Sequence, residues 1–138
     1  MLSRAVTVAV LALALALSAC GGGELSQKAL TKEVESVGSA AAEGGLLAHD
    51  AADGRSTHAF TAVHSQVLAE QAAKVERKLS SADVSPELEA KRRQADRLAA
   101  DVQAELERLH DHPADDDVTR EVADRLDEAA KAAEELAR

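Results

Sequence analysis

The chain has almost no aromatic residues. Phe60 is the only one among 138 residues, and tryptophan, tyrosine, isoleucine and asparagine do not occur. Proteins stack nucleobases and sugar rings on aromatic faces, so their scarcity argues against both classes of ligand. A core made mainly of alanine, leucine and valine buries little apolar area per residue, and we therefore expect a domain of moderate stability.

Basic residues and cysteines are also few. The part of the chain after position 20 has 15 basic and 25 acidic residues, because Arg4 is the only basic residue before it. This formal charge of −10 excludes nucleic acid as an expected partner, since a phosphate backbone needs a basic face. Cys20 is the only cysteine, so the chain cannot form an internal disulfide.

The first twenty residues have the layout of an export signal. Arg4 precedes an apolar stretch from Ala5 to Leu17, and Leu17-Ser18-Ala19-Cys20 follows. The apolar stretch is shorter than the roughly 20 residues that a membrane-spanning helix needs. Leu-Ser-Ala-Cys resembles the lipobox of bacterial lipoproteins.

The resemblance implies a lipid anchor. Residues 1–19 would be a signal peptide, removed by a type II signal peptidase after the thiol of Cys20 receives a diacylglyceryl group. Residues 20–24 would be the lipidated cysteine and a flexible glycine tether. The acyl chains would hold the protein at the extracytoplasmic face of the cell membrane, or at an outer membrane if the cell has one, since Gly21 follows the cysteine. The alternative is an ordinary signal peptide, or an uncleaved apolar start with a chance cysteine.

Beyond the tether the sequence predicts four helices, because apolar residues recur at steps of three and four. The first extends to Gly54 and is expected to break at Gly44-Gly45. The second begins near the N-cap Ser56, the third opens with Ser85-Pro86, and the fourth follows Pro113 with aspartates in its first turn. The expected core positions are Leu30, Val34, Val37, Ala41, Leu47 and Ala51; Phe60, Val67, Leu68, Ala72, Val75 and Leu79; Leu88, Ala95, Ala99, Val102, Leu106 and Leu109; and Val118, Val122, Leu126, Ala129, Ala133 and Leu136. His64 shares the stripe of the second helix and is expected to be a partly buried residue of the bundle rather than a metal ligand.

Short connections between helices of about 25 residues favour antiparallel neighbours. Residues 25–138 are therefore predicted to form an all-α domain, an antiparallel up-down bundle of four helices about 35–40 Å long. The alanine-rich apolar stripes leave one alternative open, in which helical hairpins complete a core only by dimerising.

Histidines and carboxylates gather in two connections that such a bundle places at one end, residues 49–58 and 110–117. Imidazole and carboxylate ligands suit zinc, nickel or copper(II), so a divalent-metal site is one hypothesis. The candidate ligands are His49, His58, His110, His112 and Asp115. The alternative is an ordinary solvated loop in which the aspartates cap the fourth helix.

The sequence contains no glycine-rich phosphate loop, HExxH helix or nucleophile elbow, so we expect a protein that is not an enzyme and has no cofactor beyond that possible metal. The predicted function is a structural or protein-interaction module of the cell envelope, which binds a protein partner or forms a homo-oligomer. Small residues allow helices to approach closely, so the candidate surfaces are grooves at Ala40–Ala42 and Ala129–Ala133.

Overall fold

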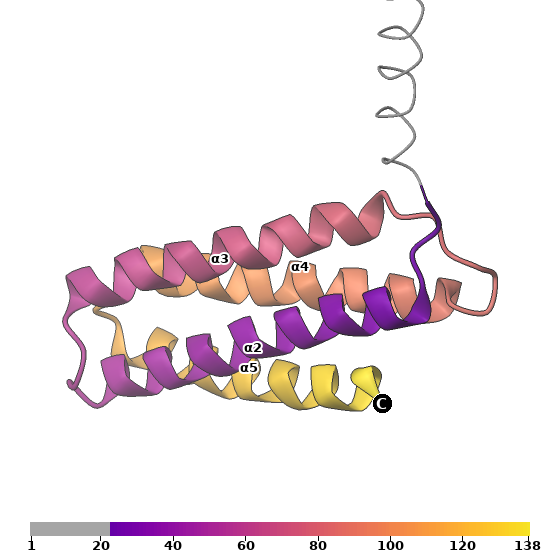
Figure 1. Cartoon of the computed structure of the whole chain (residues 1–138). Helices are drawn as coiled ribbons and strands as arrows, with labels where there is room; N and C mark the ends of the chain where they lie inside the picture. Colours follow the sequence, from indigo (N-terminus) through magenta and orange to yellow (C-terminus); the bar gives the residue numbers. More distant parts are fainter. Residues whose placement is uncertain (1–22) are drawn as a thin grey trace, which may run out of the picture.

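The computed structural model describes residues 23–138, so the predicted signal peptide and Cys20 lie outside the described residues. Within that range the chain forms four helices and no strand. The helices are α2 (Gln27–Ala52), α3 (His58–Ser80), α4 (Glu89–Asp111) and α5 (Asp116–Ala137). Consecutive helices run in opposite directions (Figure 1), which confirms the predicted all-α, antiparallel up-down bundle.

The four helices form two closely packed pairs. α2 packs mainly against α5 and α3 mainly against α4, and the pairs meet along α2–α3 and α4–α5. The α2–α3 and α4–α5 connections share one end of the bundle, which we call the far end (Figure 1). The start of α2, the α3–α4 connection and the C-terminus lie at the opposite, near end. There the backbone N–H of Leu25 donates to the carbonyl of Asp83 at 2.7 Å.

All four helices contribute to one core. The largest fully buried apolar side chains are Leu30, Val34, Val37, Leu79, Val102, Leu106, Leu109, Val122 and Leu126. The predicted stripes of α2, α4 and α5 are confirmed, with Leu88, Val118, Ala129 and Leu136 partly buried against the core. The core closes among the helices of a single chain, contrary to the alternative in which hairpins need a second copy.

Gly44 and Gly45 do not break α2, contrary to the prediction. Both are buried inside a helix that continues to Ala52. A Cβ atom on Gly44 would lie 2.5 Å from Cδ2 of Leu106, and one on Gly45 would lie 2.6 Å from Oδ1 of Asp127. The two glycines therefore let α4 and α5 approach the backbone of α2.

Two predicted helix starts are shifted. Thr57, not Ser56, is the N-cap of α3, and its hydroxyl oxygen accepts a hydrogen bond from the N–H of Phe60 at 3.2 Å. α4 begins at Glu89 rather than after Ser85-Pro86. The N–H of Leu88 donates to the carbonyl of Ser85 at 2.9 Å, so the Ser-Pro pair opens a turn that precedes the helix.

Candidate interaction surface

The first half of α3 has polar side chains inside and apolar side chains outside. Thr61 and Ser65 are fully buried. Phe60, Val63 and Val67 are 57%, 65% and 55% exposed. The prediction that Phe60 and Val67 belong to the core is therefore wrong.

Both buried hydroxyl groups form hydrogen bonds with nearby atoms. The Ser65 hydroxyl donates to the carbonyl of Ala62 at 3.0 Å, and the Thr61 hydroxyl lies 2.9 Å from that of Ser56. Neither side chain leaves an unpaired polar group in the core, which would cost about 1–3 kcal/mol. The hydroxyl groups can therefore occupy the inner face of α3 while the larger apolar side chains occupy the outer one.

A fourth exposed apolar side chain lies at the same level on α2. His64 Nε2 lies 2.7 Å from Glu43 Oε1, which joins the two helices, and the Phe60 ring stacks on the His64 ring at 5.4 Å. His64 is thus half-buried beside α2, as predicted for a partly buried residue of the bundle. Leu46 follows Glu43 by one turn of α2, and Phe60 precedes His64 by one turn of the antiparallel α3, so Leu46 and Phe60 lie level. Leu46 is 62% exposed.

We call Leu46, Phe60, Val63 and Val67 the apolar patch. Three of its four side chains, Phe60, Val63 and Val67, belong to residues 56–69, which contain no aspartate, glutamate, lysine or arginine although 30% of the whole chain is charged. Exposed apolar side chains on one stretch of a bundle are typical of a site that another protein covers.

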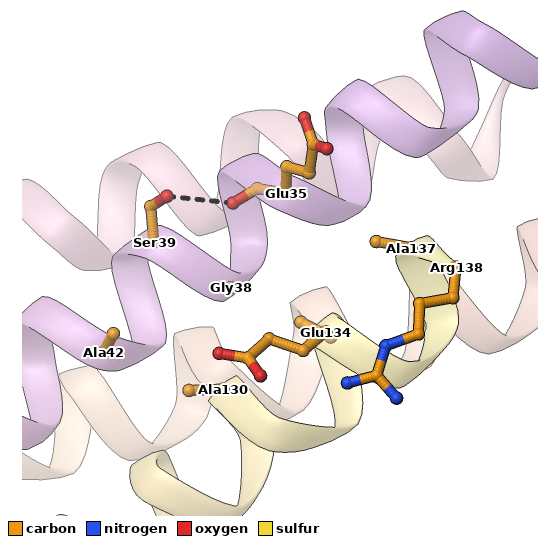
Figure 2. A pocket seen from close by; sticks show the side chains of 9 residues that line it. Glu35, Gly38, Ser39, Ala42, Ala130, Glu134, Ala137 and Arg138 are labelled. Atoms are coloured by element: carbon orange, nitrogen blue, oxygen red, sulfur yellow. Dashed lines mark hydrogen bonds between the residues drawn. The ribbon is translucent and has the colours of Figure 1, made fainter.

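A second surface feature lies between α2 and α5, where we predicted grooves of small residues (Figure 2). The cavity has a volume of about 470 Å³ and is open to solvent. Its lining is Glu35, Gly38, Ser39, Ala42, Ala130, Ala133, Glu134, Ala137 and Arg138. Ala42, Ala130 and Ala133 of the predicted grooves line it, whereas Ala40 and Ala41 are buried in the core.

The floor of this groove is a close helix contact. A Cβ atom on Gly38 would lie 2.9 Å from that of Ala133, so the two helices approach each other closely at this position. The Ser39 hydroxyl donates to the carbonyl of Glu35 at 3.0 Å and is used within its own helix (Figure 2). The groove thus presents mainly alanine side chains, with carboxylates and Arg138 at its rim.

Three of the five predicted metal ligands are held by other groups. His49 Nε2 lies 3.0 Å from Oδ2 of Asp127 on α5. His110 Nδ1 lies 2.8 Å from the carbonyl of Ala62, so this nitrogen donates its proton to α3. Oδ1 of Asp115 accepts hydrogen bonds at 3.1 Å from the N–H groups of Asp117 and Val118 in the first turn of α5, which is the capping role that the solvated-loop alternative predicted.

The other two predicted ligands are exposed at helix ends. His58 is the first residue of α3, and His112 is the C-cap of α4. Across residues 23–138 the structure brings together no group of three or more histidines, cysteines, aspartates or glutamates that could hold a metal ion. The metal hypothesis stays a prediction, without support from the geometry.

Near the far end a network of charges joins α4 to α5. Arg108 of α4 and Arg125 of α5 both donate hydrogen bonds to the carboxylate of Glu121. The bonds from Arg108 first, and from Arg125 second, lower the pKa of Glu121 from 4.5 to about 2. These contacts join α4 to α5 through charged hydrogen bonds.

None of the four described helices is long and apolar enough to cross a bilayer. Comparison of the chain with protein-family models, with curated proteins and with solved structures found no match.

Proposed function

We propose that this protein is a membrane-anchored, extracytoplasmic lipoprotein whose helical bundle is a non-catalytic protein-interaction module. The observation that supports the proposal best is the inverted polarity in the first half of α3. Fully burying an apolar side chain contributes about 1.5–3 kcal/mol, yet the bundle buries Thr61 and Ser65 there and leaves Phe60 exposed. A partner that covers the apolar patch gives these side chains the burial that the monomer does not.

The resemblance of Leu17-Ser18-Ala19-Cys20 to a lipobox supports the lipid anchor. Gly23 is three residues from Cys20, so it lies at most about 11 Å from the lipidated residue. An anchored bundle would therefore rest its near end against the membrane. α2 alone is about 39 Å long, and the apolar patch lies toward the far end of the bundle, so an anchored chain would hold the patch away from the bilayer.

The proposal is tested with the full chain produced in a bacterium and lightly crosslinked in intact cells. After detergent extraction, we expect the wild-type chain to sediment as a complex larger than one chain. The double variant Phe60→Ser/Val67→Ser should sediment as a monomer, because it removes apolar area from the patch. Ala104→Ser is the matched control, since Ala104 is exposed on α4 beside α5.

Circular dichroism of both variants should show unchanged helical content, which separates loss of a partner from loss of the fold. A wild-type chain that sediments only as a monomer, with intact crosslinking of a known control complex, would contradict the proposal.

A further inference from the structure

We infer that the near end of the bundle binds anionic lipid headgroups of the membrane that holds the anchor, through basic side chains beside the α3–α4 connection. The inference rests on the proposed function, because a tether at Cys20 is what would bring this end to a bilayer. It adds an electrostatic contact with the membrane to the lipid anchor.

The start of the described chain is fixed to the α3–α4 connection. The N–H of Leu25 donates to the carbonyl of Asp83 in this connection at 2.7 Å. Leu25 and Leu88 are both partly buried against the core. Gly23 is two residues before Leu25, so a lipid at Cys20 would lie close to the connection and to the helix ends on either side of it.

Charge is distributed unevenly along the bundle (Figure 1). Residues within seven positions of the helix ends at the near end lie within about 10 Å of that end. They belong to residues 23–33, 74–95 and 131–138, which contain 10 basic and 8 acidic residues. The rest of the chain after position 20 contains 5 basic and 17 acidic residues. The near end therefore has a formal charge of +2, and the remainder has one of −12.

Salt screening makes the charge of the near end decisive. The Debye length is about 10 Å at 0.1 M ionic strength, whereas α2 alone is about 39 Å long. A bilayer at the near end therefore interacts mainly with the local charge of +2, and the acidic far end lies several Debye lengths away. An anionic surface should attract this end although the chain as a whole is acidic.

Two cations beside the connection are not used within the protein. Arg77 is exposed and lies three residues before the end of α3, and Lys91 is partly exposed and lies two residues after the start of α4. Among the residues that the structure describes, neither forms an ion pair. The other cations within five residues of the connection are paired with carboxylates: Lys78, Arg92 and Arg93. Arg77 and Lys91 are therefore the side chains available to lipid phosphates.

The test uses the chain from Cys20 onward, because residues 23–138 contain the whole core. A single myristoyl chain is attached chemically to Cys20, the only thiol, and alone gives weak, reversible membrane binding. Sedimentation measures partition onto vesicles of phosphatidylcholine, or of two parts phosphatidylcholine and one part phosphatidylglycerol, at 0.1 M salt. Each basic residue near an anionic surface strengthens binding roughly fivefold. We expect phosphatidylglycerol to raise the partition coefficient about tenfold, and about 1 M salt to abolish the gain.

Two double variants locate the contact. Arg77→Gln/Lys91→Gln should lose most of the gain from phosphatidylglycerol and bind phosphatidylcholine as wild type does. Arg55→Gln/Arg120→Gln is the matched control, since it removes the same formal charge from exposed side chains distant from the near end. This control should keep the gain. Circular dichroism should show the same helical content in both.

Two results would overturn the inference. Weaker binding of the wild-type chain to phosphatidylglycerol vesicles would show that the overall negative charge prevails. Equal losses in the two double variants would show that the binding depends on total charge and not on the near end. Because the acyl chain is added chemically, neither result bears on natural acylation of Cys20, and a native chain without a lipid there would instead contradict the proposed function.

Discussion

Gly44 lies so close to Leu106 that a Cβ atom on the glycine would come within 2.5 Å of Cδ2 of the leucine. The same atom would lie 3.0 Å from Cδ1 of Leu126. Both leucines are fully buried. The absence of a side chain at position 44 therefore sets how closely α2 approaches α4 and α5.

Gly44→Ala should destabilise the bundle even though alanine is the better helix former. Alanine gains about 1 kcal/mol over glycine in a helix, whereas overpacking a core costs about 1–3 kcal/mol, so we expect a net loss of about 1 kcal/mol. Thermal unfolding followed by circular dichroism should show a melting temperature lower by about 4 °C.

Gly45→Ala is the control for that variant. Its new Cβ atom would lie too close only to the carboxylate of Asp127, a partly exposed side chain that can move, and would be in ordinary contact with the backbone nitrogen of that residue at 3.7 Å. We expect little change in stability. A Gly44→Ala variant that is more stable than wild type would contradict the close packing of α2 against the two leucines.

Measurements of folding stability can test whether the side chains of the apolar patch point outward. Phe60→Ser and Val67→Ser should each change the free energy of unfolding of the isolated chain by no more than about 0.5 kcal/mol, since exposed side chains contribute little to folding. Leu68, next to Val67, is buried, and Leu68→Ala should cost about 2–5 kcal/mol. Urea unfolding measures all three. A large loss in Phe60→Ser would place that ring in the core instead.

The contrast between α3 and the other helices shows what the sequence can predict. In α2, α4 and α5 a single apolar stripe fits one face, and burial follows it. In α3 two sets of positions are helically spaced, one containing Phe60, His64 and Val67 and the other containing Thr61 and Ser65. Side-chain hydrophobicity favoured the first set, but the local hydrogen bonds of the two hydroxyl groups let the second set face the core.

Two other differences between the sequence-based predictions and the structure also arise from tertiary contacts. Gly44-Gly45 predicts a break from helix propensity alone, and packing against Leu106 overrides that propensity. The sequence placed the two histidine-containing connections at one end correctly, but not the direction of the side chains. His49 points to Asp127 and His110 to the Ala62 carbonyl, and neither partner is adjacent in sequence.

Acid should weaken the contact between α4 and α5 through Glu121. Its pKa in the folded chain is lowered to about 2 by Arg108 and Arg125, below the ordinary value of 4.5. The stabilisation is therefore fully present above pH 4.5 and is lost as the pH falls toward 2. Glu121→Gln should be less stable than wild type at neutral pH, and the difference in urea midpoint should shrink between pH 5 and pH 2. A difference that is independent of pH would show that the charge of Glu121 plays no part.

A measurement of zinc binding distinguishes the two functions that the sequence suggested, a protein-interaction module and a metal-binding protein. Because His49 and His110 are already bonded to other groups and Asp115 caps α5, we expect no stoichiometric binding of Zn²⁺ at micromolar concentration in equilibrium dialysis. The variant His110→Ala/His112→Ala should behave like wild type. Stoichiometric binding that this variant loses would support the metal-binding alternative.

The orientation of the bundle, and with it the exposure of the apolar patch away from the membrane, depends on a lipid at Cys20. The most direct measurement is the intact mass of the chain recovered from bacterial membranes, with Cys20→Ser as the control. We predict a chain that begins at Cys20 and carries a diacylglyceryl group, and a control that carries none. A chain that retains residues 1–19, or one that is cleaved but has no lipid, would contradict the anchored interaction module.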